Sequence, residues 1–417
     1  MQKEFHDMTK HWILKEADLP FEVVILLIGG MTMLITGFLL FPVSAGSLPY
    51  FENGLYGLIL VMFALQIIAL GKTPLGDVRR SKPLIALGVV VAAVGIAACF
   101  VPDIFGQLPR ILLVLCFGPG GLLLLLQMCI AREKLRTWAQ YGGIFLHLIA
   151  GCGTVYVLSM LIALLIWKQN LLTTAMMAAV ALIFGLAILY LAGVLRKIYG
   201  KYPGAGKPSK DGVELTTDQA VILVMGVWML ILGILLTPIN LGLLPFSGSA
   251  QLGLLMVIFA VQMLASGSTP IGPFPRSWLM ILFGLLFAAP GIVSCIIPEI
   301  LVLPLTVLVG VLNILGGVIT LWQICIPRLR KSEEPRAPVP PVMNKLFAAQ
   351  LIMNPLTILF GVSMLVSNLI PGLVIGAIFA ANGCVLLYSL HLLMVLDKMQ
   401  PSIVGSPRQL DSAKSEN

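Results

Sequence analysis

Two stretches decide the fold: VILLIGGMTMLITGFLLFP at residues 24–42 and AVILVMGVWMLILGILLTP at residues 220–238. Each is a run of about 20 residues without a charged side chain, the length that an α-helix needs to cross the hydrocarbon core of a bilayer. The second stretch lies 196 positions after the first, and both carry a glycine at the same position and end on a proline. The pair therefore predicts a transmembrane helix that occurs in two copies.

Composition extends this prediction to the whole chain. Of its 417 residues, 59% are hydrophobic and only 11% are charged, and the mean hydropathy is +1.03, which lies outside the range of soluble proteins. No cleavage site of small residues follows the first apolar run, so we expect that run to stay in the membrane. We predict an all-α, polytopic membrane protein with twelve spans and almost no soluble domain. The predicted spans are 21–42, 54–71, 84–101, 110–131, 142–166, 171–195, 219–238, 251–267, 278–297, 302–326, 346–370 and 373–396.

The similarity between the two halves continues well beyond the first span. Residues 24–132 align with residues 220–328 at the constant offset of 196 and without a gap. The shared positions include Gly37/Gly233, Pro42/Pro238, Pro49/Pro245, Gln66/Gln262, Gly88/Gly284, Cys99/Cys295, Pro102/Pro298, Gln127/Gln323 and Cys129/Cys325. We interpret this as a duplicated six-helix unit, and because six is an even number the two copies would be parallel. The predicted organisation is a cytoplasmic segment (1–20), a first repeat (21–199), a linker (200–218), a second repeat (219–399) and a disordered cytoplasmic tail (400–417).

Within each unit the helices form hairpins. Prolines mark the same end of five odd-numbered spans, at Pro42, Pro102, Pro238, Pro298 and Pro371, and each is followed by a short loop and a glycine-containing return helix. This pattern resembles the HdeD-like short-repeat membrane proteins of bacteria. The resemblance implies a stack of helical hairpins with a role in acid resistance, and it brings no catalytic residues.

The distribution of positive charge predicts the orientation. Of the 26 Lys and Arg residues, all except Arg110 and Lys168 fall in segments on one side of the predicted spans. Such an excess over short loops marks the cytoplasmic face, so both termini are expected inside the cell and the protein in the cell (inner) membrane. The basic residues are scattered beside helix ends, which does not indicate a nucleic-acid partner. The expected partners are the lipid bilayer, other membrane proteins or a second copy of the chain.

A repeated loop supplies the first candidate site. Residues 71–76 read GKTPLG and residues 267–272 read GSTPIG, and each loop is followed by an arginine, so the candidates are Thr73, Arg80, Thr269 and Arg276. Backbone amides of such a loop could bind an anion beside the arginine. The alternative is that glycine and proline end a helix here and that the arginine marks the inner interface.

Polar side chains within the spans supply the second set of candidates. Gln66 and Gln262 lie well inside two equivalent spans and could line a polar cavity, although such amides more often hydrogen-bond neighbouring helices. His147 and Thr154 flank a glycine-rich break in the fifth span, and Asn354 precedes Pro355 in the eleventh. Interrupted helices at matching positions of two halves point to a binding site. The alternative for these residues is a neutral hydrogen bond between helices.

The sequence lacks the residues that several kinds of functional site require. No Asp, Glu, Lys or Arg lies in the middle of a span, which disfavours an ion-coupled transporter. The seven cysteines form no Cys-x-x-Cys pair, and no haem ligands, metal cluster or carboxylate pair is evident, so no cofactor is expected. We therefore expect a non-catalytic membrane protein, HdeD-like or an accessory subunit. The alternatives are a channel or facilitator for a small neutral solute and an enzyme that acts on a lipid or quinone at the inner interface.

Overall fold

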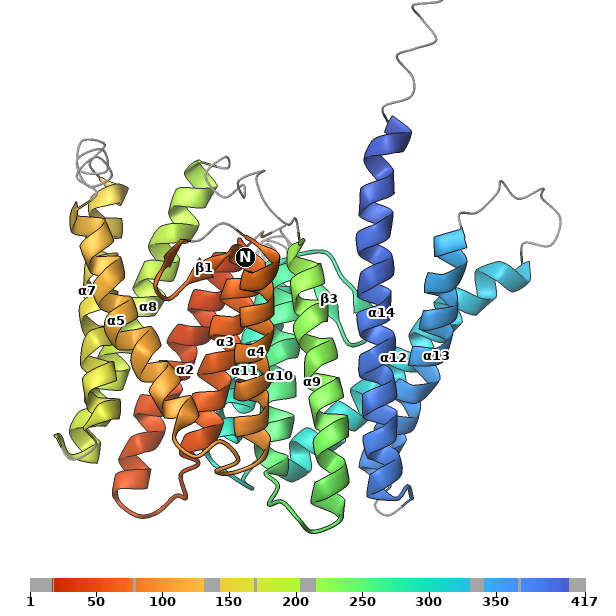
Figure 1. Ribbon diagram of the computed structural model, residues 1–417, viewed down its shortest axis with the longest axis horizontal. Coiled ribbons are helices and arrows are strands. Elements are labelled where there is room, and N and C mark those ends of the chain that lie inside the picture. The colour runs from red at the N-terminus through yellow and green to blue at the C-terminus, as the bar shows by residue number, and fades with distance from the viewer. Residues whose placement is uncertain are drawn as a thin grey trace, which may run out of the picture.

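The computed structural model describes residues 17, 19–77, 80–130, 143–168, 171–202, 215–330, 341–366 and 369–404. In these residues twelve helices are long and apolar enough to span a membrane, which confirms the all-α, polytopic fold (Figure 1). The first six are α2 (Phe21–Ser44), α3 (Glu52–Leu70), α4 (Lys82–Phe100), α5 (Leu108–Ile130), α7 (Ile144–Trp167) and α8 (Thr174–Lys201). The other six are α9 (Thr217–Asn240), α10 (Gly248–Ser266), α11 (Trp278–Ile296), α12 (Val302–Arg330), α13 (Pro341–Leu365) and α14 (Gly372–Val404).

The helix ends differ modestly from the predicted span ends. Helix α14 continues to Val404, into the segment 400–417 for which a disordered tail is predicted, while residues 405–417 lie outside the described part. Helices α2 and α9 each pass their proline, Pro42 or Pro238, by two residues. The physical reason is that backbone hydrogen bonds carry a helix into its polar flanks, whereas the predicted spans follow the apolar residues alone.

Local chemistry explains where several helices begin. Ser81 and Ser277 cap α4 and α11, because each hydroxyl accepts a hydrogen bond from the backbone N–H three residues on. Thr216 and Gln219 form a reciprocal capping box at the start of α9. Gly71 and Gly267 end α3 and α10 in the left-handed conformation, with φ of 67° and 72°, which is inexpensive only for glycine. These caps favour the helix-stop interpretation of the two glycine-rich loops.

Each of those loops is a tight antiparallel hairpin. Strand β1 (Lys72–Thr73) pairs with β2 (Gly76–Asp77), and β3 (Ser268–Thr269) pairs with β4 (Gly272–Pro273). Both hairpins lie at the end of the bundle where α2 begins and α3 ends (Figure 1). We call this the hairpin end, and the other the opposite end.

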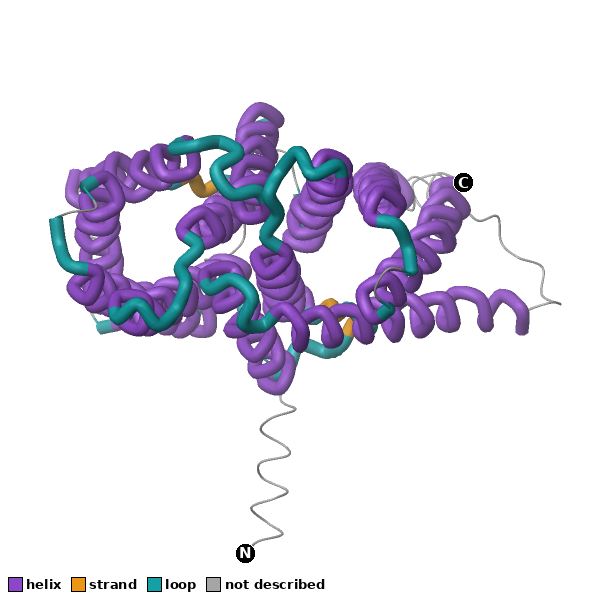
Figure 2. Tube along the Cα trace, turned by 90° about the horizontal axis from the view of Figure 1, so that it is seen from below, coloured by secondary structure: helices purple, strands orange, loops and turns teal. Residues whose placement is uncertain are grey.

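The helices of each half pack in the same order. In the first half α2, α8, α7, α5 and α3 each contact the next, and α3 contacts α2, so that five helices form a closed ring. In the second half α9, α14, α13, α12 and α10 form an equivalent ring. Figure 2, which looks along the helices, shows the two rings side by side. A duplicated six-helix unit would produce this equivalent order, and the duplication itself stays a prediction.

The remaining two helices join the halves. Helix α4 packs on α3 and on α9 of the other half, and α11 packs on α10 and on α2 of the other half. Helices α3 and α10 lie at the centre, with 78% and 83% of their spans buried. The contact between the halves is therefore a packed apolar core.

Candidate functional site

The ring of the first half encloses a cavity of about 470 Å³, which is within the range of small-molecule sites. Its walls come from α2, α3, α5, α7, α8 and the β1–β2 hairpin. On α2 the lining runs from Glu22 to Met33, which corresponds to a depth of about 16 Å at 1.5 Å per residue. On every helix the lining residues lie in the hairpin-end portion and reach about the middle of the bundle. From this extent of the lining we infer that the cavity is blind and that its mouth lies at the hairpin end.

Most of the wall is apolar. The aliphatic and sulfur-containing side chains that line it are Ile25, Leu26, Met33, Ile59, Met62, Cys116, Leu124, Met128, Leu148, Cys152, Val155, Ile188, Leu191 and Leu195. Such a surface favours an apolar ligand over a hydrated ion, because burying an ion without partners costs several kcal/mol.

Three aromatic rings close the inner end of the cavity. Phe63 and Phe117 meet edge to face with their ring centroids 5.3 Å apart, and Phe117 meets Phe184 in the same way at 6.0 Å. Edge-to-face packing at these distances is favourable beyond the area that it buries. Beside them, the Ser159 hydroxyl donates to the carbonyl oxygens of Phe117 and Tyr156, at 3.1 and 2.8 Å. We call Phe63, Phe117 and Phe184 the aromatic floor.

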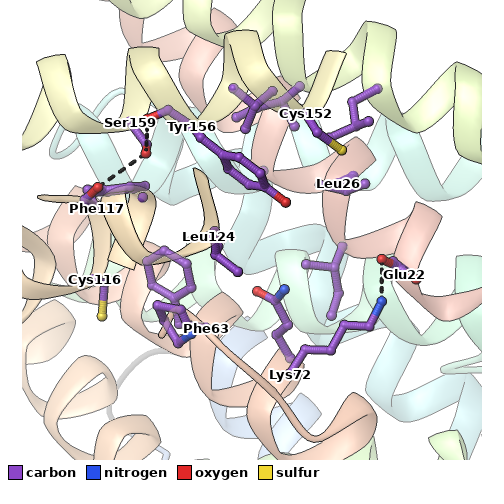
Figure 3. Close-up of a pocket in the computed structure, with 18 of the residues that line it drawn as sticks. Glu22, Leu26, Phe63, Lys72, Cys116, Phe117, Leu124, Cys152, Tyr156 and Ser159 are labelled. Carbon is purple, nitrogen blue, oxygen red and sulfur yellow. Dashed lines mark hydrogen bonds and ion pairs between the residues drawn. The ribbon is translucent and has the colours of Figure 1, made fainter. Parts of the chain in front are cut away.

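An ion pair lies near the mouth (Figure 3). The Lys72 ammonium donates to Glu22 Oε1 at 2.7 Å, and the Tyr199 hydroxyl donates to Glu22 Oε2 at 2.6 Å. Both oxygens of the carboxylate are thus engaged, and the side chains of Glu22 and Lys72 are 21% and 35% exposed. The pair contributes no net charge to the cavity.

The β1–β2 hairpin covers part of the mouth. Lys72, Thr73 and Pro74 line the cavity, and the Thr73 hydroxyl donates to the Gly76 carbonyl at 2.7 Å. A side chain at Gly120 of α5 would come within 2.7 Å of the Pro74 carbonyl oxygen, so glycine there lets the hairpin lie directly on α5. In the other half the Thr269 hydroxyl donates to the Gly272 carbonyl at the same distance. Both threonine hydroxyls are used inside their hairpins, which leaves them poorly placed to hold an anion.

The two loop arginines contact different segments of the chain. Arg80 Nη1 donates to the Leu215 carbonyl at 3.0 Å, and burial lowers the pKa of this guanidinium. The Arg276 carbonyl accepts from the Ala17 backbone N–H at 3.0 Å. Each contact ties one half to the segment that precedes the first helix of the other half. These bonds hold the halves together at the hairpin end.

The predicted cavity residues are only partly brought together. Gln66 and Thr73 line the first-half cavity, whereas Gln262 and Thr269 occupy the matching positions of the second half. Asn354 is buried in α13, also in the second half, and donates to the Gln350 carbonyl at 2.9 Å. The predicted site that would combine His147 with Asn354 is not formed, because α7 and α13 belong to different rings.

The two candidate residues of α7, His147 and Thr154, face outward. His147 is exposed and its Nδ1 lies 2.7 Å from the Tyr190 hydroxyl, a contact between neighbouring helices. Thr154 is exposed and donates to the Ala150 carbonyl one turn earlier. The His147 contact fits the interpretation as a hydrogen bond between helices, whereas the Thr154 bond lies within α7.

Sequence reasoning missed the polar residues that matter most at the mouth, namely Glu22, Lys72 and Tyr199. Glu22 stands in the first turn of a span and Lys72 in a loop, so both look like ordinary interfacial charges. The signal that could have identified them is the pairing of opposite charges at one end of two neighbouring spans.

Nothing in the described residues suggests a metal site, since no group of three His, Cys, Asp or Glu side chains is placed to hold an ion. Comparison with family models, curated proteins and solved structures finds no match to this chain. The inference of function therefore depends on the cavity alone.

Proposed function

We propose that this protein is a membrane facilitator of the carrier type, which takes a small, mainly apolar molecule into the cavity of its first half. The observation that carries the proposal is the blind cavity of about 470 Å³ inside a closed ring of five helices. A continuous pore would need lining residues toward both ends, whereas this lining stops at the aromatic floor. Carriage across the membrane then requires a second conformation in which the floor opens.

The proposal includes an orientation. Lys72, Arg80, Lys82, Arg196, Lys197, Lys201, Arg276 and Lys345 all lie at the hairpin end, and Arg110 and Lys168 at the opposite end. By the positive-inside rule, the hairpin end and the mouth of the cavity face the cytoplasm.

Binding is tested by filling the cavity. Gly29 lines the cavity, and a Cβ atom there would meet no atom within 4 Å, so Gly29→Leu can extend a side chain into the cavity. Gly193 on α8 is exposed and equally free of neighbours, which makes Gly193→Leu the matched control. The probe is a small apolar aryl diazirine, photolysed with the purified protein in nanodiscs and mapped by peptide mass spectrometry.

We expect the diazirine to label cavity-lining peptides in the wild type and in Gly193→Leu, and to lose that labelling in Gly29→Leu. Equal labelling of these peptides in all three proteins would refute a binding cavity.

Carriage is tested at the aromatic floor. In a cysteine-free background, Met33→Cys places a thiol near the inner end of the cavity. A carrier exposes this thiol to an impermeant maleimide from either side of the membrane, whereas a binding protein that does not transport exposes it from the mouth only.

A second candidate is the non-catalytic, HdeD-like or accessory role in stress or acid resistance. The packed core between the halves supports it, because α3 and α10 are the centre of a rigid scaffold. This candidate predicts that Gly29→Leu leaves acid survival of the cell unchanged, while a deletion of the gene lowers it. The third alternative, a lipid or quinone enzyme built around Arg80 and Arg276, receives less support because backbone contacts tie these residues to different segments.

A further inference from the structure

The charges at the cavity mouth are already satisfied. Glu22 accepts from Lys72 and from Tyr199, one bond to each carboxylate oxygen. A ligand carboxylate at Lys72 would lie beside the like charge of Glu22, and a ligand ammonium at Glu22 would lie beside the like charge of Lys72. Because the pair is neutral, it offers a ligand charge no net attraction to offset the cost of removing that charge from water. The mouth therefore selects against charged head groups.

Two side-chain amides near the ion pair remain available. Gln66 of α3 and Gln127 of α5 both line the cavity, and neither side chain hydrogen-bonds to a residue in the described part of the chain. Each amide offers a donor and an acceptor, which suits a hydroxyl, a carbonyl or an amide on a ligand. Where water is excluded such a group gains from a partner, because lipid supplies none.

Below these amides the wall turns apolar and ends at the aromatic floor. Polarity therefore varies along the cavity axis, with the amides and the neutralised ion pair nearer the mouth than the Phe63–Phe117–Phe184 cluster. At 1.5 Å per residue, Gln66 lies about 4.5 Å from Phe63 along α3, and Gln127 lies about 15 Å from Phe117 along α5. A molecule that is polar at one end and apolar at the other matches this arrangement. Figure 3 shows the Tyr156 side chain between the two regions, with its hydroxyl directed into the cavity.

We propose that the cavity binds an uncharged amphipathic molecule, whose hydrogen-bonding head group lies between Gln66 and Gln127 and whose apolar body reaches the aromatic floor. This inference names the substrate class of the proposed carrier and so rests on that function. Uncharged here means that the head group carries neither a carboxylate, a phosphate nor an ammonium.

The test uses three photoprobes that share one medium-length alkyl chain with a diazirine and differ only in the head group. These are the primary alcohol, the carboxylate and the ammonium. Each is photolysed with the full-length protein in nanodiscs of uncharged lipid, and cavity peptides are quantified by mass spectrometry. We expect the alcohol to label them at least tenfold more than either charged probe. Gly29→Leu should abolish this labelling and Gly193→Leu should preserve it.

The amides provide the second arm. Gln66→Leu should lower labelling by the alcohol about three- to tenfold, as expected for one lost hydrogen bond, while labelling by the apolar aryl diazirine stays unchanged. Gln127→Leu, near the mouth and more exposed, gives the same readout if Gln66→Leu folds poorly.

Two results would overturn the inference: a charged probe that labels as strongly as the alcohol, or alcohol labelling that neither glutamine variant reduces. If the aryl diazirine itself fails to label the cavity in a Gly29-dependent way, the carrier proposal fails first, so the two failures are distinguishable.

Discussion

The backbone N–H of Phe51 donates a hydrogen bond to the carbonyl oxygen of Ile296 in the other half, at 2.9 Å. The same bond recurs with the halves exchanged, because the Ser247 N–H donates to the Phe100 carbonyl at 2.8 Å. Ser247 follows Phe51 by 196 positions, and Ile296 follows Phe100 by the same number. A twofold relationship between two parallel units would produce a reciprocal pair of this kind.

The close approach at this junction can be tested at Gly54. A side chain on Gly54 would overlap the carbonyl oxygen of Cys295, a backbone atom that cannot move aside cheaply. We therefore expect Gly54→Ala to destabilise the protein by about 1–3 kcal/mol, as overpacking does. Gly193→Ala, on an exposed helix face, should instead stabilise slightly because alanine is the better helix former. Apparent melting temperatures in detergent would show opposite shifts, and equal shifts would contradict the packing described.

Sequence reasoning succeeded where each residue acts through its own helix. The twelve spans follow from apolar length, and Gly71 and Gly267, for which a helix stop is one of the two interpretations, end α3 and α10. The hydrogen bond between Tyr199 and Glu22 could not be predicted from the sequence, because it joins residues 177 positions apart. Helices that are apolar on all sides do not reveal which face is buried. The order of helices in the ring, and with it the cavity, is set by packing that the sequence does not display.

The same limit applies to the prediction that His147 lines a cavity. Depth along a span could be estimated from the sequence, but the direction of the side chain could not, and it points away from the cavity toward Tyr190. His147→Phe should therefore leave photolabelling of the cavity unchanged and lower stability by less than about 1 kcal/mol, the usual value for a hydrogen bond between membrane helices. Labelling by the aryl diazirine and the melting temperature check both statements. If the His147→Phe variant is folded but loses cavity labelling, His147 contributes to the binding site.

The orientation is tested at the two ends of α8 and its preceding loop. Lys168 lies at the opposite end and Lys201 at the hairpin end, and both are exposed. In a cysteine-free background we expect an impermeant maleimide to label Lys168→Cys on intact cells and Lys201→Cys only after lysis, because the hairpin end carries most of the positive charge. The reverse pattern would invert the topology and turn the cavity mouth outward.

Two substitutions at Trp228, in the second half, compare the stability lost with a buried ring and the stability lost to an unpaired buried donor. The ring is fully buried and meets Phe100 and Phe379 edge to face, at 6.0 and 5.8 Å, while its indole N–H has no partner in the described part of the chain. Trp228→Ala should cost about 3–5 kcal/mol, the usual range for such a truncation. Trp228→Phe should cost less than half of that, because an aromatic ring remains and the unpaired donor is removed. Similar losses in both variants would show that the N–H is satisfied.

Asn382 permits the sharpest comparison, because a second buried asparagine serves as its control. The Oδ1 atom of Asn382 is buried without a partner among the described residues, whereas Asn313 Nδ2 donates to the Val309 carbonyl at 2.8 Å. Both side chains are at least nine-tenths buried. Replacing a buried polar group that lacks its hydrogen bond removes a desolvation penalty of about 1–3 kcal/mol, so Asn382→Leu should be neutral or stabilising. Asn313→Leu removes the hydrogen bond to Val309 and should therefore lower the melting temperature. If Asn382→Leu instead destabilises the protein more than Asn313→Leu does, its carbonyl oxygen has a ligand in the membrane, and the second half binds a polar group of its own.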